Sequence, residues 1–166
     1  MADFVEWDPL DSHGERTLAA RFAAWLRGQQ NEAKAGGLTL KVFHWSHPER
    51  SELKSILGLG EVGDLIDPDS GVFIDLEQVF KANFVSLHRS SIKKVAPLFG
   101  FTWRVDDPGG AISKTYLSKV RTSTDPDEVV KAKEWLPTYN EDDNAAMAKI
   151  RDSTRSEANV LRAWMR

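Results

Sequence analysis

The side chains best suited to chemistry gather in one run, Tyr139 to Asp143, with the sequence YNEDD. On a helix, Tyr139 and Asp143 lie four residues apart and share one face. A carboxylate there can bind a divalent ion, and a phenol beside it can orient the attacking water. An acidic run at the start of a helix can also serve only to compensate the helix dipole. The run is therefore the first candidate for a hydrolytic metal site.

Positive charge is concentrated in the middle of the chain, although the whole chain carries a net charge of −3. Residues 81–121 contain eight basic and two acidic side chains, so the flanking segments are acidic. This division is typical of a nuclease in which one surface holds phosphates and another gathers metal ligands. A solvated surface with no such role is the alternative.

The composition limits the kinds of site that the chain can build. Cysteine is absent, so disulfides and thiolate metal sites are excluded, and any metal must bind carboxylates or histidines. The 166 residues, 41% apolar and 28% charged, fit a single domain spanning residues 1–166. No leader opens the chain, and its apolar runs fall far short of the ~20 residues that cross a bilayer. We therefore expect a cytoplasmic location.

Periodic patterns in the first half predict helices and strands in alternation. Apolar residues recur at helical spacing before Gly36, and Pro48 suits the first position of a helix. Glycine, aspartate and proline are frequent over residues 58–71, which indicates a surface loop. The expected elements are a helix (14–34), a strand (38–43), a helix (48–57), the loop (58–71) and a strand end passing into a helix (72–80).

The second half is predicted to be almost entirely helical. Its expected elements are a helix capped by Ser90 or Ser91 and ending at Gly100, a turn (106–110), a short helix from Ile112, a helix (125–135) and a long helix (138–164). Pro137 is expected to interrupt the last two. Residues 4–7 offer one more possible strand. The chain is therefore α/β but poor in strands, so either strands are missed or part of the sheet lies outside this chain.

Two motifs resemble those of a known nuclease family. The Tyr-x-x-x-Asp spacing of Tyr139 and Asp143 resembles the third motif of DnaQ-type 3′-to-5′ exonucleases of the DEDDy class. The similarity is closest to the YprB-type RNase H-like branch that is associated with RecB-family nucleases. Residues 41–49 are similar to the second motif, a strand followed by an acidic residue that opens a helix, which places Glu49 at the carboxylate position.

The segments between these motifs resemble the same family in the same order. Phe73 to Leu76 is similar to the family strand that ends in Asp-Leu, with Asp75 as its aspartate. Residues 86–101 resemble its Ser-Leu-Lys-x-Val-x-x-x-Leu-Gly-Phe helix, and residues 107–110 resemble the turn that follows. The resemblance thus covers roughly residues 15–150.

The resemblance implies a fold and an activity. The fold would be an RNase H-like central sheet flanked by helices, and the activity would be metal-dependent hydrolysis of phosphodiester bonds from a 3′ end of DNA or RNA. Glu49 and Asp143 would bind Mg²⁺ or Mn²⁺, and Tyr139 would orient the water. Three cations, Arg89, Lys93 and Lys94, would bind the nucleic-acid backbone. The alternative is that they are ordinary exposed cations of a helix. For His44 we expect a capping or core role rather than a metal role.

The sequence departs from the family at the first motif, an Asp-x-Glu pair on the opening strand. Glu6 and Asp8 are the nearest candidates, but they stand in the reverse order. We therefore expect an N-terminally truncated, helix-rich domain in which residues 4–7 correspond to a later strand. Three alternatives follow: an upstream polypeptide supplies the strand, Glu6 or Asp8 substitutes, or the domain is a catalytically inactive module that binds nucleic acid or protein. An exposed sheet edge also predicts a homodimer or a partner polypeptide.

Overall fold

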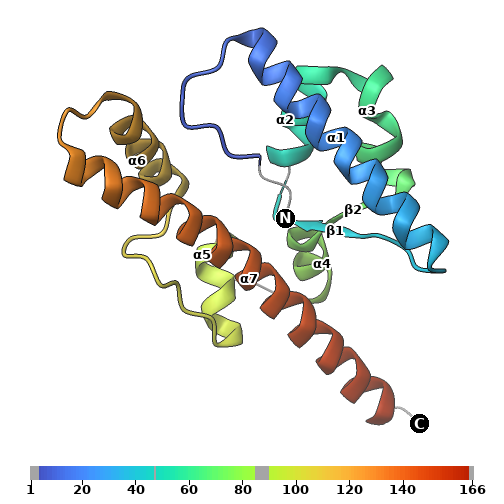
Figure 1. Ribbon diagram of the computed structural model, residues 1–166. Coiled ribbons are helices and arrows are strands. Elements are labelled where there is room, and N and C mark those ends of the chain that lie inside the picture. Colours follow the sequence, from blue (N-terminus) through green and yellow to red (C-terminus); the bar gives the residue numbers. More distant parts are fainter. Residues whose placement is uncertain (1–3, 47, 85–89, 165–166) are drawn as a thin grey trace. The chain divides into compact units, whose positions relative to one another are not determined.

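The computed structural model describes residues 4–46, 48–84 and 90–164 (Figure 1). The chain divides into two compact units, Met1–Leu76 and Glu77–Arg166. The first unit holds the strands, and the described part of the second is helical. The helix-rich α/β character expected from the sequence is confirmed.

A parallel pair of strands forms the centre of the first unit. Strand β1 (Val42–His44) pairs with β2 (Phe73–Asp75), and His44 lies opposite Asp75 at the carboxyl end of the pair. Helices α2 (Pro48–Leu57) and α3 (Leu59–Ile66), followed by the short 3₁₀ helix η1 (Pro68–Ser70), make the crossover between the strands. The strand predicted over residues 38–43 overlaps β1 only at Val42 and Phe43, and the strand end predicted from Val72 contains β2.

Helix α1 (Ser12–Ala35) packs on this crossover and agrees with the helix predicted over residues 14–34. Asp11 caps it by accepting a hydrogen bond from the backbone N–H of Gly14 at 2.7 Å. Arg27 of α1 forms a bidentate ion pair with Asp64 of α3 at 2.7 and 2.8 Å. The guanidinium holds the pKa of Asp64 below its usual value through its hydrogen bond and charge. The long first helix is thus fixed to α3 at its polar surface as well as through its apolar face.

The surface loop predicted over residues 58–71 is wrong, because this segment contains α3. Gly58 has a positive φ of 80°, and the helix begins directly after it. Val62, Leu65 and Ile66 have the spacing of one helical face, and all three are buried. Burial of this stripe outweighs the low helix propensity of the neighbouring glycines.

The strand considered for residues 4–7 does not form. This segment has no regular secondary structure. Phe4 instead packs its ring against Phe22 and Trp25 of α1, with centroids 5.4 and 5.6 Å away. An aromatic contact with a helix satisfies the apolar side chains that suggested a strand.

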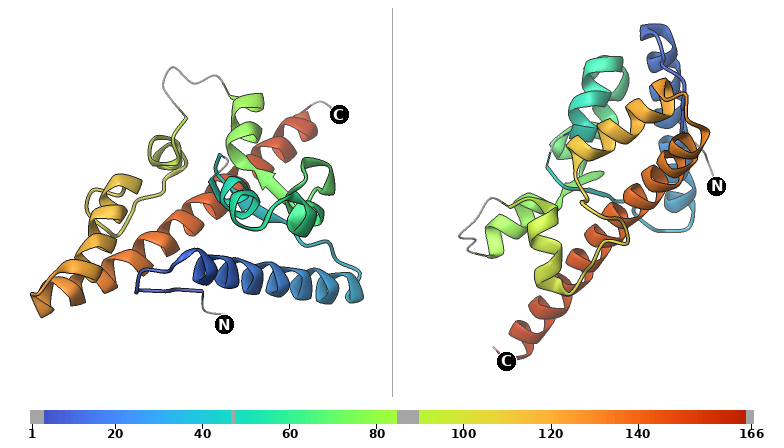
Figure 2. Two further views of the ribbon diagram at one scale, coloured as in Figure 1. Left: turned by 90° about the horizontal axis from the view of Figure 1, so that it is seen from above. Right: turned by 90° about the vertical axis from the view of Figure 1, so that its left-hand side faces the viewer.

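The second unit consists of helices around one long helix, α7 (Pro126–Trp164). The shorter elements that precede it are α4 (Leu76–Asn83), α5 (Ile92–Val95), the 3₁₀ helix η2 (Ala96–Phe99) and α6 (Gly110–Thr122). Gly100 ends η2 in the left-handed conformation that glycine favours, as predicted from the sequence. Helix α6 lies alongside the N-terminal part of α7, and α5 and η2 contact α7 further along (Figure 2).

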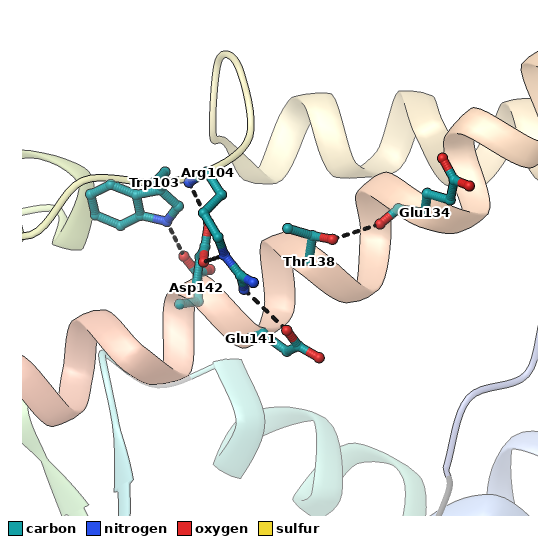
Figure 3. Close-up of polar contacts among 7 residues, drawn as sticks. Trp103, Arg104, Glu134, Thr138, Glu141 and Asp142 are labelled. Carbon is teal, nitrogen blue, oxygen red and sulfur yellow. Dashed lines mark hydrogen bonds and ion pairs between the residues drawn. The ribbon is translucent and has the colours of Figure 1, made fainter.

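Pro137 does not interrupt α7, so the predicted division into two helices is wrong. Proline removes one backbone hydrogen bond, but the nearby side chains of Leu136 and Tyr139 are buried and hold the helix to its neighbours. Thr138 adds a hydrogen bond from its hydroxyl to the Glu134 carbonyl at 2.8 Å (Figure 3). Despite the length of α7, no helix among the described residues is apolar enough over a sufficient length to cross a bilayer.

Candidate functional site on helix α7

One face of α7 carries a buried stripe that includes a carboxylate. The buried positions, spaced three or four residues apart, are Ala132, Leu136, Tyr139, Asp142, Ala146 and Ile150. This spacing is that of a helix face turned toward its neighbours. Asp142 therefore occupies a position that would otherwise hold an apolar side chain, and a buried carboxylate requires partners.

Arg104 supplies those partners (Figure 3). Its backbone N–H and its Nε both donate to Asp142, each at 2.6 Å, one to each carboxylate oxygen. Its Nη2 also donates to Glu141 at 3.0 Å. The hydrogen bonds to Asp142 and then to Glu141 raise the pKa of Arg104 above its usual value. Asp142 is thus saturated and serves to attach the segment around Arg104 to α7.

Asp143, the predicted metal ligand, accepts contacts from Lys93 and Trp103. Trp103 donates its indole N–H to Asp143 Oδ1 at 3.0 Å, and the Lys93 ammonium forms an ion pair with the same oxygen. The Lys93 Nζ also lies 4.5 Å from the centroid of the Trp103 ring and 4.3 Å from that of the Tyr139 ring. Such positions favour a cation, because ring faces carry partial negative charge.

The surroundings of Lys93 shift its ionisation. Burial lowers the pKa of Lys93, and the hydrogen bond and negative charge of Asp143 oppose this shift only in part. Lys93 is therefore a partly desolvated ammonium held between two rings and a carboxylate. The sequence predicts that this lysine contacts the nucleic-acid backbone, and that role remains a prediction.

Tyr139 and Asp143 share a face of α7 as the sequence predicts, and they interact. Burial first, then the charge of Asp143 and a hydrogen bond to it, raises the pKa of Tyr139 to about 12. The phenol is consequently protonated at neutral pH and acts as a hydrogen-bond donor. This state suits the orientation of a water molecule and does not suit general-base chemistry.

An aromatic stack extends from Tyr139 toward α6. The Tyr139 ring stacks on Trp135 with centroids 4.9 Å apart, and Trp135 stacks on Tyr116 of α6 at 4.4 Å. The indole N–H of Trp135 is buried without a hydrogen-bond partner. The stack fixes the side-chain orientation of Tyr139 through packing, so the phenol is positioned before any ligand binds.

In the first unit, polar groups gather where the two strands end. Ser46 has a positive φ of 71°, and its N–H donates to Asp75 at 3.1 Å. His44 is buried, with Nδ1 against the Ser46 carbonyl, and its Nε2 is buried without a hydrogen-bond partner. Glu49 is half-exposed and approaches His44 Nδ1 at 3.9 Å. The core role expected for His44 agrees with its burial.

The remaining predicted residues are placed as follows. Glu6 and Asp8 are exposed in the irregular segment before α1, and Lys94 is exposed on α5. Arg89 lies outside the described residues. Glu49 and Asp75 belong to the first unit, whereas Tyr139, Asp143 and the two lysines belong to the second.

The donor chemistry of the candidate carboxylates fits a hard divalent cation, since Mg²⁺ and Mn²⁺ prefer carboxylate oxygens. Asp143 would be the ligand from α7, and its Oδ1 already contacts the Lys93 ammonium. Across the described ranges, no three His, Asp or Glu side chains group closely enough to hold a metal ion.

The sequence did not indicate Trp103 or Arg104 as parts of this cluster, and it did not single out Asp142 within the run over residues 139–143. The buried spacing along α7 could have singled out Asp142 as a carboxylate that needs a partner. Nothing local could have paired it with Arg104, which is 38 residues away.

Comparisons with known proteins give one family assignment. A family model described as the RNase_H superfamily matches residues 39–155, which is more than half of the chain and includes Glu49, Asp75 and the α7 cluster. No curated protein and no solved structure gives a significant match.

Proposed function

Because the chain belongs to the RNase H superfamily, we propose that it is a metal-dependent nuclease domain. It would hydrolyse phosphodiester bonds of a DNA or RNA strand, in the manner of a DEDDy-type 3′-to-5′ exonuclease of the YprB-type branch. The observation that carries this proposal is the position of Tyr139 and Asp143 one turn apart on α7, where the phenol lies beside the carboxylate. A fixed phenol beside a carboxylate is the combination that this chemistry uses to place a water molecule.

Each residue has a distinct role in this proposal. Asp143 and Glu49 bind Mg²⁺ or Mn²⁺, and Asp75 is a further candidate carboxylate. When bound, the ion activates a water molecule and stabilises the leaving oxygen. Tyr139 keeps its proton at neutral pH, and its phenol would hydrogen-bond the water beside Asp143 and so orient it. The proposal requires that Glu49, from the first unit, and Asp143, from the second, reach one ion.

In this proposal, binding of the DNA or RNA strand depends on charge rather than on base identity. Lys94 is exposed and free to meet a phosphate, and Arg89 was assigned the same role from the sequence. Lys93 could join them only by leaving Asp143, since its ammonium is now paired there. Phosphate contacts of this kind give affinity without sequence preference, as an exonuclease requires.

A second candidate function is a catalytically inactive RNase H-like module that binds nucleic acid or another protein. The ion pair between Lys93 and Asp143 favours it, because a carboxylate already neutralised by an ammonium attracts a metal ion less strongly. A module that binds nucleic acid would share salt-sensitive binding with the nuclease, and only the nuclease predicts cleavage.

A cleavage assay separates these two functions. A 3′-labelled single strand of DNA, and one of RNA, is incubated with Mg²⁺ or Mn²⁺ and the intact chain, with Asp143→Asn or with Glu141→Gln. Glu141 is the matched control, since it is an exposed acid in the same run. Release of the label by the wild-type chain and by Glu141→Gln, with loss in Asp143→Asn, supports the nuclease. Salt-sensitive binding without release in all three chains supports the inactive module.

We also propose that the two-stranded sheet is extended by a strand from a second copy or from an upstream polypeptide, which would supply the Asp-x-Glu pair of the first motif. This arrangement would complete an RNase H-like central sheet flanked by helices. Light scattering of the chain alone and with such a polypeptide tests the proposal. A monomer that fails to associate in either sample contradicts it.

A further inference from the structure

We propose that the Lys93 ammonium and a divalent cation compete for the Asp143 carboxylate, so that Lys93 sets the metal affinity of this site. The inference rests on the proposed function in one respect, namely that Asp143 is a metal ligand. It adds a residue whose charge opposes metal binding.

The first support is the position of the ammonium. Lys93 Nζ contacts Asp143 Oδ1, the oxygen that also accepts the Trp103 indole N–H. An incoming metal ion at this oxygen would lie next to a full positive charge. Two cations this close repel each other strongly in a partly desolvated site, so one must leave for the other to bind.

The second support is a contrast between the two neighbouring aspartates. The side chain of Asp142 is 3% exposed, and both of its oxygens accept hydrogen bonds from Arg104. The side chain of Asp143 is 28% exposed, and its contacts with Lys93 and Trp103 both use Oδ1. Asp142 is therefore closed to a cation from solvent, whereas Asp143 can be reached by one. Competition at Asp143 is thus physically possible, and at Asp142 it is not.

The third support is that Asp143 stays in place without Lys93. The Trp103 indole donates to this carboxylate, and the Tyr139 ring, which is stacked on Trp135, lies one turn away on the same helix. Removal of the lysine charge therefore exposes a positioned carboxylate rather than a disordered one. The rings of Trp103 and Tyr139, which flank the Nζ, can instead pack against an uncharged chain of similar length.

Metal titration of the full chain tests the competition directly. Isothermal titration with Mn²⁺ compares the wild type with Lys93→Met, which keeps the length of the side chain and removes its charge. We expect Lys93→Met to bind Mn²⁺ at least about tenfold more tightly, because a full charge is removed beside the ligand. Lys94→Met, which removes a neighbouring exposed charge, should change the affinity less than about twofold, because an exposed charge is screened by solvent.

Further variants distinguish failure of this inference from failure of the proposed function. Lys93→Arg keeps the charge and should bind Mn²⁺ like the wild type, and Lys93→Met with Asp143→Asn should lose the gain. Equal affinity in Lys93→Met and the wild type, with weaker binding in Asp143→Asn, overturns the competition and leaves Asp143 a metal ligand. Absence of Mn²⁺ binding in all variants overturns both. Lys93→Gln replaces Lys93→Met if circular dichroism shows that the latter is unfolded.

Discussion

The candidate site carboxylates of the two units have different surroundings. On α7, Asp142 and Asp143 are paired with the cations Arg104 and Lys93. At the strand ends of the first unit, Glu49 is half-exposed and lies 3.9 Å from the Nδ1 of His44, with no lysine or arginine paired with it in the part of the chain that the structure describes. One region therefore has its acids neutralised by its own cations, and the other presents an acid to solvent.

This difference shows that carboxylates of the same motif set can differ in how readily they bind a cation. A paired acid is held rigidly and must exchange its cation before it binds another. An exposed acid is hydrated and has no ion pair to break, so a smaller free-energy cost opposes its binding of a cation. Substitutions of paired and of exposed residues in the two regions therefore test this difference between the carboxylates.

The largest expected effect is on the free energy of unfolding, through the hydrophobic core of the first unit. Leu65 of α3 is fully buried, so Leu65→Ala should lower the free energy of unfolding by about 3 kcal/mol through lost burial and a residual cavity. Leu59→Ala, on the same helix but 56% exposed, should change it by less than about 0.5 kcal/mol. Urea unfolding followed by circular dichroism measures both. Equal losses would mean that α3 is not packed as described.

The next effect compares two neighbours on α7 that share Arg104. Asp142→Ala removes a buried acceptor of a backbone N–H, which should cost about 2 kcal/mol in unfolding free energy. Glu141→Ala removes an exposed acid and should leave the unfolding midpoint unchanged. Thermal unfolding of the two variants checks the order. A larger loss in Glu141→Ala would contradict the assignment of the structural acid.

A smaller difference is expected between the two proposed metal ligands in the absence of metal. Asp143→Asn leaves the Lys93 ammonium partly buried without its carboxylate, which should cost roughly 1–2 kcal/mol, since both side chains keep some contact with solvent. Glu49→Gln should be neutral within about 0.5 kcal/mol. Denaturant titrations with a chelator present make the comparison. Equal costs would remove the contrast between the two regions.

The smallest effect is spectroscopic. In Tyr116→Phe, which leaves one tyrosine, ultraviolet absorbance should report ionisation of Tyr139 at a pH near 12, and Asp143→Asn should lower this midpoint. The folded pKa lies above the ordinary value of about 10, so the unfolded chain loses this proton first. The phenol's contribution to stability is therefore present below pH ~10 and is lost as the pH rises toward 12. A midpoint near 10 would show that Tyr139 is exposed.

Local sequence signals predicted much of the fold. Caps and periodicity placed α1, the start of α2 at Pro48 and the end of η2 at Gly100, because these depend on neighbouring residues. The errors at α3 and at Pro137 have a common cause. In both, residues that disfavour a helix are outweighed by burial of an apolar face, which depends on distant parts of the chain.

The candidate site was predictable only where it is local. The shared face of Tyr139 and Asp143 follows from helical geometry alone. The ion pair with Lys93 joins residues 50 positions apart, and the Trp103 contact joins residues 40 apart, so neither could be read from spacing. Lys93 was predicted to meet a phosphate because its charge was visible and its carboxylate partner was not.

The most direct measurement of the central claim is whether Glu49 and Asp143 hold one ion. Electron paramagnetic resonance of Mn²⁺ gives the affinity and stoichiometry for the wild type, Glu49→Gln, Asp143→Asn and the double variant. We predict one site that either single substitution weakens at least about tenfold, with little further loss in the double variant, because removal of either ligand already disrupts the shared site. Wild-type affinity in Glu49→Gln, or two independent losses that add, would contradict a shared metal ion.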